Sequence, residues 1–154
     1  MNTFFKTLVM INLLILSPLT LADDDFVGVI DAKTLHANYE HFADEYADYD
    51  VKEADVTLLQ KIDSPITITA LFGTWCHDSM REVPRLNKLL TAANNSNITT
   101  TLIAVDRNKT IDESYKLQYT PTIIVYRDNN EIGRIIETPT KSIAQDIADI
   151  VSNH

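Results

Sequence analysis

The chain has 154 residues, of which 13 are Lys or Arg and 22 are Asp or Glu, giving a formal net charge of −9. This length fits one domain that can bury a core of its own. The negative charge repels phosphate backbones and anionic membrane surfaces, which argues against nucleic acid as a partner. The chain contains a single cysteine, so no internal disulfide can stabilise the fold.

Residues 1–22 have the pattern of an export signal. Lys6 supplies a basic start, an apolar run covers 8–16, and Pro18 with small residues leads to Ala22. We expect cleavage after Ala22 and an exported mature protein, with the periplasm as the expected compartment and secretion as the alternative. The apolar run is shorter than the roughly 20 residues of a membrane-spanning helix. We therefore expect no stable membrane anchor after cleavage.

Residues 23–62 are predicted to form a helical extension that precedes the main domain. Between positions 33 and 49 the apolar residues recur at steps of three and four, which predicts one amphipathic helix. Residues 54–62 predict a second, shorter helix. His36 and His41 fall outside the apolar stripe, and we interpret them as part of a solvated charged face, with metal ligation as the weaker alternative.

Residues 63–154 carry the alternating strands and helices of an α/β domain. Strands are predicted where β-branched residues run together, and helices where apolar residues recur with helical spacing. The turn 127–130, rich in Asp and Asn, predicts a hairpin. The predicted strands are 66–72, 98–106, 122–126 and 131–137, and the predicted helices are 76–93 and 141–151, with a short helical or irregular crossing at 110–117.

Cys76 stands where the buried strand 66–72 gives way to a helix. Unpaired N–H groups and the positive end of the helix dipole stabilise a thiolate at such a position. This makes Cys76 the candidate nucleophile, with the hydroxyl of Ser79 one turn further on as a second stabilising group. His77 would add positive charge and Asp78 would oppose the thiolate. The alternative is that both are simply exposed residues at a helix start.

Three features together resemble the thioredoxin family: Trp75-Cys76 after a buried strand, Pro84 eight residues beyond the cysteine, and Thr120-Pro121 before the hairpin. The resemblance implies a three-layer α/β fold, with a central mixed sheet flanked by helices and an extra N-terminal helical segment. It also implies a cis peptide bond before Pro121, next to the cysteine, and neither a cofactor nor a metal. The residues that would bind the substrate are Trp75, His77, Asp78, Thr120 and Pro121.

Two positions depart from the family pattern. Ser79 replaces the second cysteine of the Cys-x-x-Cys motif, and Ala70 stands where the family has a buried acid. A serine hydroxyl cannot displace a thiol from a mixed disulfide. Cys76 could therefore attack a disulfide but could not release itself by the two-cysteine route.

We therefore expect an exported monothiol thiol-disulfide oxidoreductase or isomerase with Cys76 and Ser79 as its catalytic positions. Cys76 would form mixed disulfides with protein or low-molecular-weight thiols and disulfides, and an external thiol reductant would resolve them. Two alternatives stay open. One is a non-catalytic thioredoxin-fold binding or chaperone-like module that uses the groove around Pro121. The other is a redox-sensing homodimer linked through Cys76.

Overall fold

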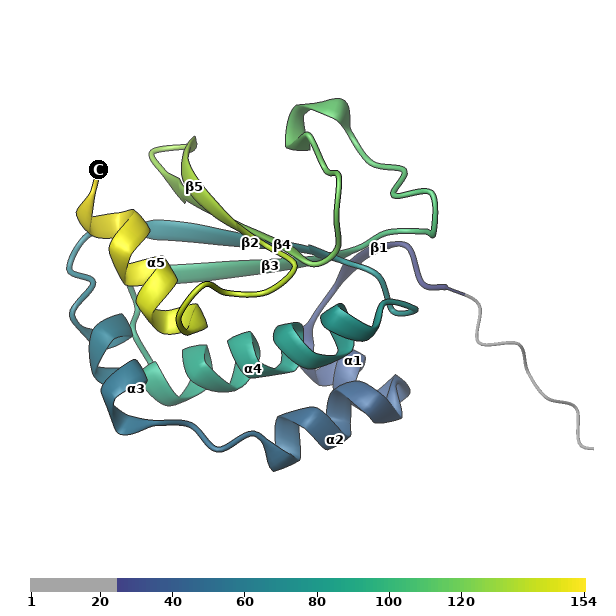
Figure 1. Cartoon of the computed structure of the whole chain (residues 1–154), viewed down its shortest axis with the longest axis horizontal. Helices are drawn as coiled ribbons and strands as arrows, with labels where there is room; N and C mark the ends of the chain where they lie inside the picture. Colours follow the sequence, from purple (N-terminus) through teal and green to yellow (C-terminus); the bar gives the residue numbers. More distant parts are fainter. Residues whose placement is uncertain (1–24) are drawn as a thin grey trace, which may run out of the picture.

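A five-stranded mixed sheet forms the centre of the computed structural model, which describes residues 25–154 (Figure 1). The expected export signal lies outside the described residues. The strand order is β1-β3-β2-β4-β5, with β2 and β3 parallel and the other neighbours antiparallel. The strands are β1 (Gly28–Ile30), β2 (Ile66–Phe72), β3 (Ile98–Ala104), β4 (Thr122–Arg127) and β5 (Asn130–Ile136).

Five helices and one 3-10 turn complete the described chain. The helices are α1 (Ala32–Asn38), α2 (Glu40–Asp48), α3 (Glu53–Gln60), α4 (His77–Ala93) and α5 (Ile143–Ser152), and the 3-10 turn is η1 (Glu113–Tyr115). The predicted α/β fold with a mixed sheet is confirmed. In the main domain, β2 has the predicted bounds and the ends of the other elements differ by one or two residues. Within residues 25–154, no helix has the length and apolar character needed to cross a membrane.

The single helix predicted over 33–49 is wrong, because the chain forms α1 and α2 with a break at Tyr39. Tyr39 has φ −127° and ψ 101°, an extended conformation that ends one helix and precedes the next. The chain turns there, so that the ring centroids of His36 and Tyr46 lie 4.5 Å apart. In one continuous helix these residues would be about 15 Å apart along the axis. Two helices that face a common core therefore produce the same apolar spacing as one.

The break also changes the environment of His36. Its ring is half-buried against Tyr46, and burial lowers the pKa of the imidazole from its ordinary value. The interpretation as a solvated face is therefore wrong for His36. His41, on α2, is exposed as expected.

The N-terminal segment also contributes a strand that the sequence pattern did not predict. β1 has three residues and pairs antiparallel with β3, where Gly28 lies opposite Ala104. Such a run is shorter than the alternation that identifies a strand in a sequence. Gly28 has φ +124°, a conformation that glycine adopts without a Cβ clash. Through β1, the segment 25–62 is part of the same sheet as the main domain.

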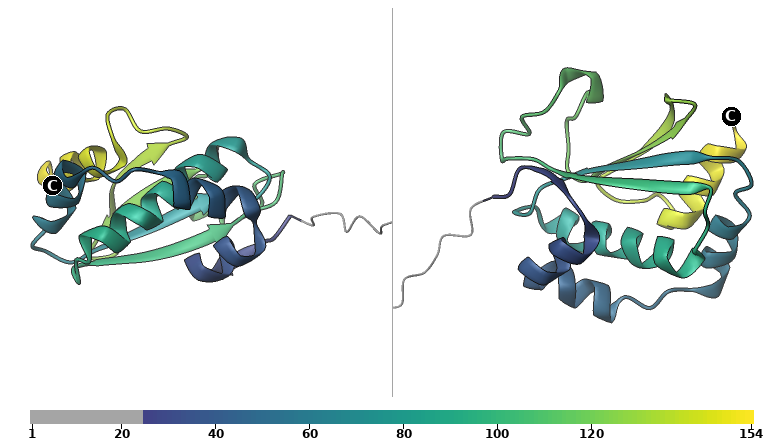
Figure 2. Two further views of the ribbon diagram at one scale, coloured as in Figure 1. Left: turned by 90° about the horizontal axis from the view of Figure 1, so that it is seen from below. Right: turned by 180° about the vertical axis from the view of Figure 1, so that it is seen from behind.

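All five helices lie on one face of the sheet, as the views in Figures 1 and 2 agree, so the mixed sheet is as expected but the expected helices on both of its faces are not found among residues 25–154. α4 and α5 contact the strands, and α2 and α3 pack against α4. The segment 105–121, which contains η1, lies over one end of the opposite face (Figure 1). The connection from β3 to β4 therefore crosses that face with only the 3-10 turn η1, which agrees with the short helical or irregular crossing predicted for 110–117.

The residues of β2 alternate according to these two faces. Ile66, Ile68, Ala70 and Phe72 are buried in the core cluster shared with the helices. Thr67, Thr69 and Leu71 point to the opposite face, because successive side chains of a strand alternate. Thr67 is exposed at the open end of that face, and its hydroxyl lies 3.0 Å from the hydroxyl of Thr99 on β3.

Candidate active site

Cys76 lies at the junction between β2 and α4, and it is the N-cap residue of α4. Its backbone is extended, with φ −95° and ψ 121°, and the side chain makes no capping hydrogen bond. The side chain is half-buried. Its thiol donates a hydrogen bond to the carbonyl oxygen of Thr120, with 3.1 Å between Sγ and O. The only cysteine is therefore partly accessible and lies at the N-terminal end of a helix.

The turn that faces the cysteine comes from a distant part of the chain. The Thr120–Pro121 peptide bond is cis, as the family resemblance implied, and both residues are buried. The hydroxyl of Thr122 donates to the carbonyl of Tyr119 over 2.7 Å, which closes the turn at the start of β4. β2 and β4 are neighbours in the sheet, so the end of one strand and the start of the other meet at the sulfur.

Ser79 occupies a different environment from Cys76, although both belong to the first turn of α4. Ser79 is fully buried, and its hydroxyl accepts a hydrogen bond from the backbone N–H of Gly73 over 3.2 Å. This bond joins the turn after β2 to the start of the helix. No hydrogen bond between Ser79 and Cys76 occurs in the described part of the chain. Ala70 is also fully buried, so the position of the family's acid is apolar.

Trp75 is held against the segment 105–121. Its indole N–H donates to the carbonyl of Val105 over 3.1 Å, and the guanidinium of Arg107 lies 5.4 Å from the ring centroid. Arg107 in turn pairs with Asp25 at 2.9 Å. A Cβ on Gly73 would lie 2.5 Å from Cε2 of the indole, so the absence of a side chain at Gly73 lets the ring pack over the backbone.

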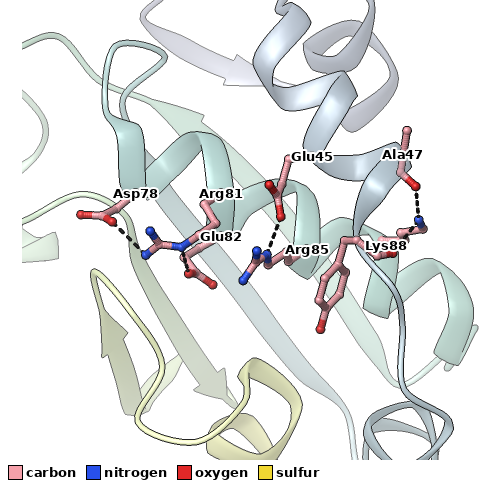
Figure 3. Close-up of polar contacts among 8 residues, drawn as sticks. Glu45, Ala47, Asp78, Arg81, Glu82, Arg85 and Lys88 are labelled. Atoms are coloured by element: carbon pink, nitrogen blue, oxygen red, sulfur yellow. Dashed lines mark hydrogen bonds and ion pairs between the residues drawn. The ribbon is translucent and has the colours of Figure 1, made fainter.

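Asp78 takes part in a network of ion pairs that the sequence pattern did not predict (Figure 3). Arg81 donates to Asp78 at 2.8 Å and to Glu82 at 2.6 Å. Glu82 is only 3% exposed, and its hydrogen bond is the main reason that the pKa of the Arg81 guanidinium is raised. The sequence signal for this network was Glu82, an acid on the apolar side of the helix predicted over 76–93. Because Arg81 pairs with Asp78, the negative charge of Asp78 near the cysteine is partly neutralised.

His77 is exposed and lies beside a shallow groove between α2 and α4. The groove has a volume of about 350 Å³ and is lined on the α2 side by His41 and several acidic residues. On the same helix pair, Glu45 contacts Arg85 at 2.6 Å (Figure 3). Within residues 25–154, no group of three or more His, Cys, Asp or Glu side chains is arranged to hold a metal ion.

A family model described as thioredoxin matches residues 29–150. The chain belongs to the thioredoxin family. The thioredoxin of Chlamydia pneumoniae is 27% identical over 93 residues, which cover 60% of this chain and 86% of that protein. The thioredoxin of Staphylococcus aureus is 25% identical over 105 residues, which cover 68% of this chain and 96% of that protein.

Among solved structures, a protein of unknown function from Pseudomonas aeruginosa superposes with a TM-score of 0.52 at 17% identity. The match covers 80% of this chain and 82% of that one, and at this identity it supports the fold alone. Family membership implies thiol-disulfide chemistry in general, with thiols and disulfides of proteins as the class of reactant. The position of Cys76 agrees with that chemistry.

Proposed function

We propose that this protein is an exported monothiol oxidoreductase or isomerase that exchanges disulfides through Cys76. The observation that carries the proposal is the position of the only cysteine, half-buried at the start of α4 and 3.1 Å from the carbonyl of Thr120. The second position of the family motif is Ser79, which is buried and bonded to the backbone. One sulfur therefore performs the whole reaction.

The exchange proceeds in two balanced steps. The Cys76 thiolate attacks one sulfur of a substrate disulfide, so that a bond forms between Cys76 and that sulfur and the other sulfur leaves as a thiolate. An external thiol, or a second cysteine of the substrate, then attacks the substrate sulfur of the mixed disulfide. Cys76 leaves as a thiolate, and a new disulfide joins the substrate sulfur to the attacking thiol. The cycle shuffles disulfides or removes adducts without net oxidation of this protein.

Export is part of the proposal and rests on the pattern of residues 1–22. An oxidising compartment such as the periplasm supplies substrates with disulfides. A lone cysteine is suited to isomerisation of such disulfides, because an isomerase needs a thiolate but no disulfide of its own.

Capture of mixed disulfides tests the proposal. The mature protein is mixed with a disulfide-containing protein such as insulin and quenched with acid, and adducts are identified by mass spectrometry. We expect adducts on Cys76 that a Cys76→Ser variant lacks. A native thiol that forms no adduct, and that alkylating reagents modify no faster than free cysteine, would contradict the proposal and favour the binding-module alternative.

Replacement of Ser79 tests the monothiol step. The Ser79→Cys variant gains a thiol at the second position of the motif, and an internal thiolate there competes with external thiols for the mixed disulfide. We expect shorter-lived adducts and a gain in insulin reduction with an external reductant. Ser79→Ala is the matched control, since it removes the same hydroxyl without adding a thiol. Equal adduct lifetimes for the native, Ser79→Cys and Ser79→Ala proteins would show that release is not limited by this position.

A further inference from the structure

The outer edge of β5 carries backbone groups that no other part of the described chain uses. β5 is the last strand in the sheet order, so only β4 pairs with it. The N–H of Glu137 donates to the carbonyl of Pro121, and this bonded pair sets the alternation along the two strands. Arg134 and Ile136 lie at the intervening positions, opposite Ile124 and Thr122. The N–H groups of Arg134 and Ile136 and the carbonyl of Arg134 therefore point away from β4, toward the open edge.

Hollows border this strand on both faces of the sheet. The first, of about 620 Å³, lies between β5 and residues 116–119, and its apolar lining includes Tyr119, Ile132 and Ile136. The second, of about 490 Å³, lies between β5 and α5. Because Arg134 and Ile136 line both hollows, each hollow reaches the open edge of β5. Tyr119 is 50% exposed and Ile136 is 47% exposed, which leaves apolar surface uncovered in the first hollow.

The first hollow borders the turn that faces Cys76. Tyr119 and Thr122 line it, and Thr120, one of the two residues between them in the turn, accepts the hydrogen bond from Cys76. Ile136, at the end of β5, pairs with Thr122 at the start of β4. A chain that lies along the open edge of β5 would therefore end beside Ile136, one strand away from the turn that faces the sulfur.

We propose that β5 is a strand-addition site for the polypeptide substrate of Cys76. An extended segment of the substrate pairs with the open edge through its backbone, and its alternate side chains enter the two hollows. This inference rests on the proposed function, and it deepens that function by naming the substrate class as an extended protein segment. A low-molecular-weight disulfide is too small to use the edge.

The lining of the two hollows defines the side chains that fit. The first hollow takes an apolar side chain against Tyr119 and Ile136. Arg134 is bonded to Glu131 and to the carbonyl of Tyr115, whereas Lys116 forms no salt bridge among residues 25–154, although its charge helps to lower the pKa of Glu131. A carboxylate near the apolar side chain would pair with Lys116. The preferred segment therefore combines a β-branched apolar residue with an acidic residue.

The test uses short synthetic peptides that carry one cysteine blocked as a pyridyl disulfide. One peptide has an extended flank with Ile and Glu, and its matched control has Ser and Gln in their place. Attack by Cys76 forms the mixed disulfide and releases thiopyridone, whose absorbance gives the rate. Dithiodipyridine, which has no peptide, reports the reactivity of the thiol alone. We expect the Ile and Glu peptide to react about tenfold faster than its control, a difference that corresponds to about 1.4 kcal/mol.

Two protein variants and two peptide variants locate the effect. Ile136→Ser should remove the preference, whereas Val29→Ser, an equivalent change at a 69% exposed residue of the opposite edge strand, should leave it unchanged. Both should react normally with dithiodipyridine. N-methylation of one alternate set of peptide amides should abolish the preference and N-methylation of the other set should not, because only alternate residues of an added strand bond to β5.

The outcomes separate the two proposals. Normal reaction with dithiodipyridine but equal rates for both peptides would overturn strand addition and leave the proposed function intact. No reaction with dithiodipyridine would overturn both. Sedimentation of the native protein as a dimer that Ile136→Ser converts to a monomer would also overturn the inference, because it would assign the edge to a second copy of the chain.

Discussion

The face of the sheet that carries the helices and the opposite face are built from the same strands but differ in their side chains. On β2, Ile66 and Ile68 point to the helices and are buried, whereas Thr67 between them is exposed. Toward the active site the opposite face changes, and Leu71 is fully buried near the segment 105–121. Along β2, the helix-covered positions are apolar, whereas on the opposite face Thr67 is exposed and Thr69 and Leu71 are buried. The exposed pair Thr67 and Thr99 therefore marks the part of the opposite face that lacks a covering layer.

The largest expected effect tests the difference between the two faces along β2. Ile68→Ala removes a fully buried side chain from the helix-covered face, and we expect a loss of about 2–5 kcal/mol in the free energy of unfolding. Thr67→Ala, the neighbouring change on the open face, removes one exposed hydroxyl contact and should cost at most about 1 kcal/mol. Urea denaturation of the two variants measures both values. Similar losses at the two positions would show that the open face is covered in solution.

A second prediction concerns how the segment 105–121 is attached to the opposite face. Gly73→Ala places a Cβ 2.5 Å from the indole of Trp75, whose N–H binds Val105. We expect a loss of about 1–3 kcal/mol and an altered fluorescence spectrum, since Trp75 is the only tryptophan.

Gly133→Ala is the matched control for this change, because its Cβ would meet Ile150 on the helix-covered face at 2.8 Å. It should destabilise the protein without changing the emission of Trp75. If Gly73→Ala leaves the spectrum of the folded protein unchanged, the indole is not held in the position described.

The smallest expected effect is a pH dependence of stability that comes from His36, on the helix-covered side of the sheet. Burial lowers the pKa of His36 in the folded state, so the unfolded chain takes up the proton first as the pH falls. Stability should therefore decrease as the pH falls below about 6.5, and the decrease should be complete once the pH is below the folded pKa. His36→Gln should lack this component, while His41→Gln, at an exposed position, should retain it. Urea denaturation at a series of pH values measures the difference, and identical pH profiles for all three proteins would contradict it.

Much of the candidate site could be predicted from the sequence because its parts are local. The strand 66–72, the following cysteine and the start of the next helix are contiguous, and their order alone places Cys76 at a helix N-terminus. The departure from the family motif at Ser79 could also be predicted from the sequence, because the motif is local. Its burial and its bond to Gly73 were not predictable, because they depend on how the turn after β2 folds back on the helix.

The errors have related physical causes. The helix predicted over 33–49 divides at Tyr39, because apolar spacing records which residues face the core and does not record whether one or two helices present them. β1 was missed because three residues are too few to show alternation. Glu82 was passed over because a single acid in an apolar stripe gains its significance from burial and from Arg81.

The amino-acid sequence by itself determined the α/β class, the single cysteine at the start of a helix, and the loss of the second cysteine. These follow from local patterns of side chains and from the chemistry of one residue. Only the tertiary structure decided that Thr120 receives the thiol hydrogen bond, that all the helices lie on one face, and that hollows border both faces of β5. Each of these depends on contacts between segments far apart in the chain, and their geometry is set by packing of the whole fold.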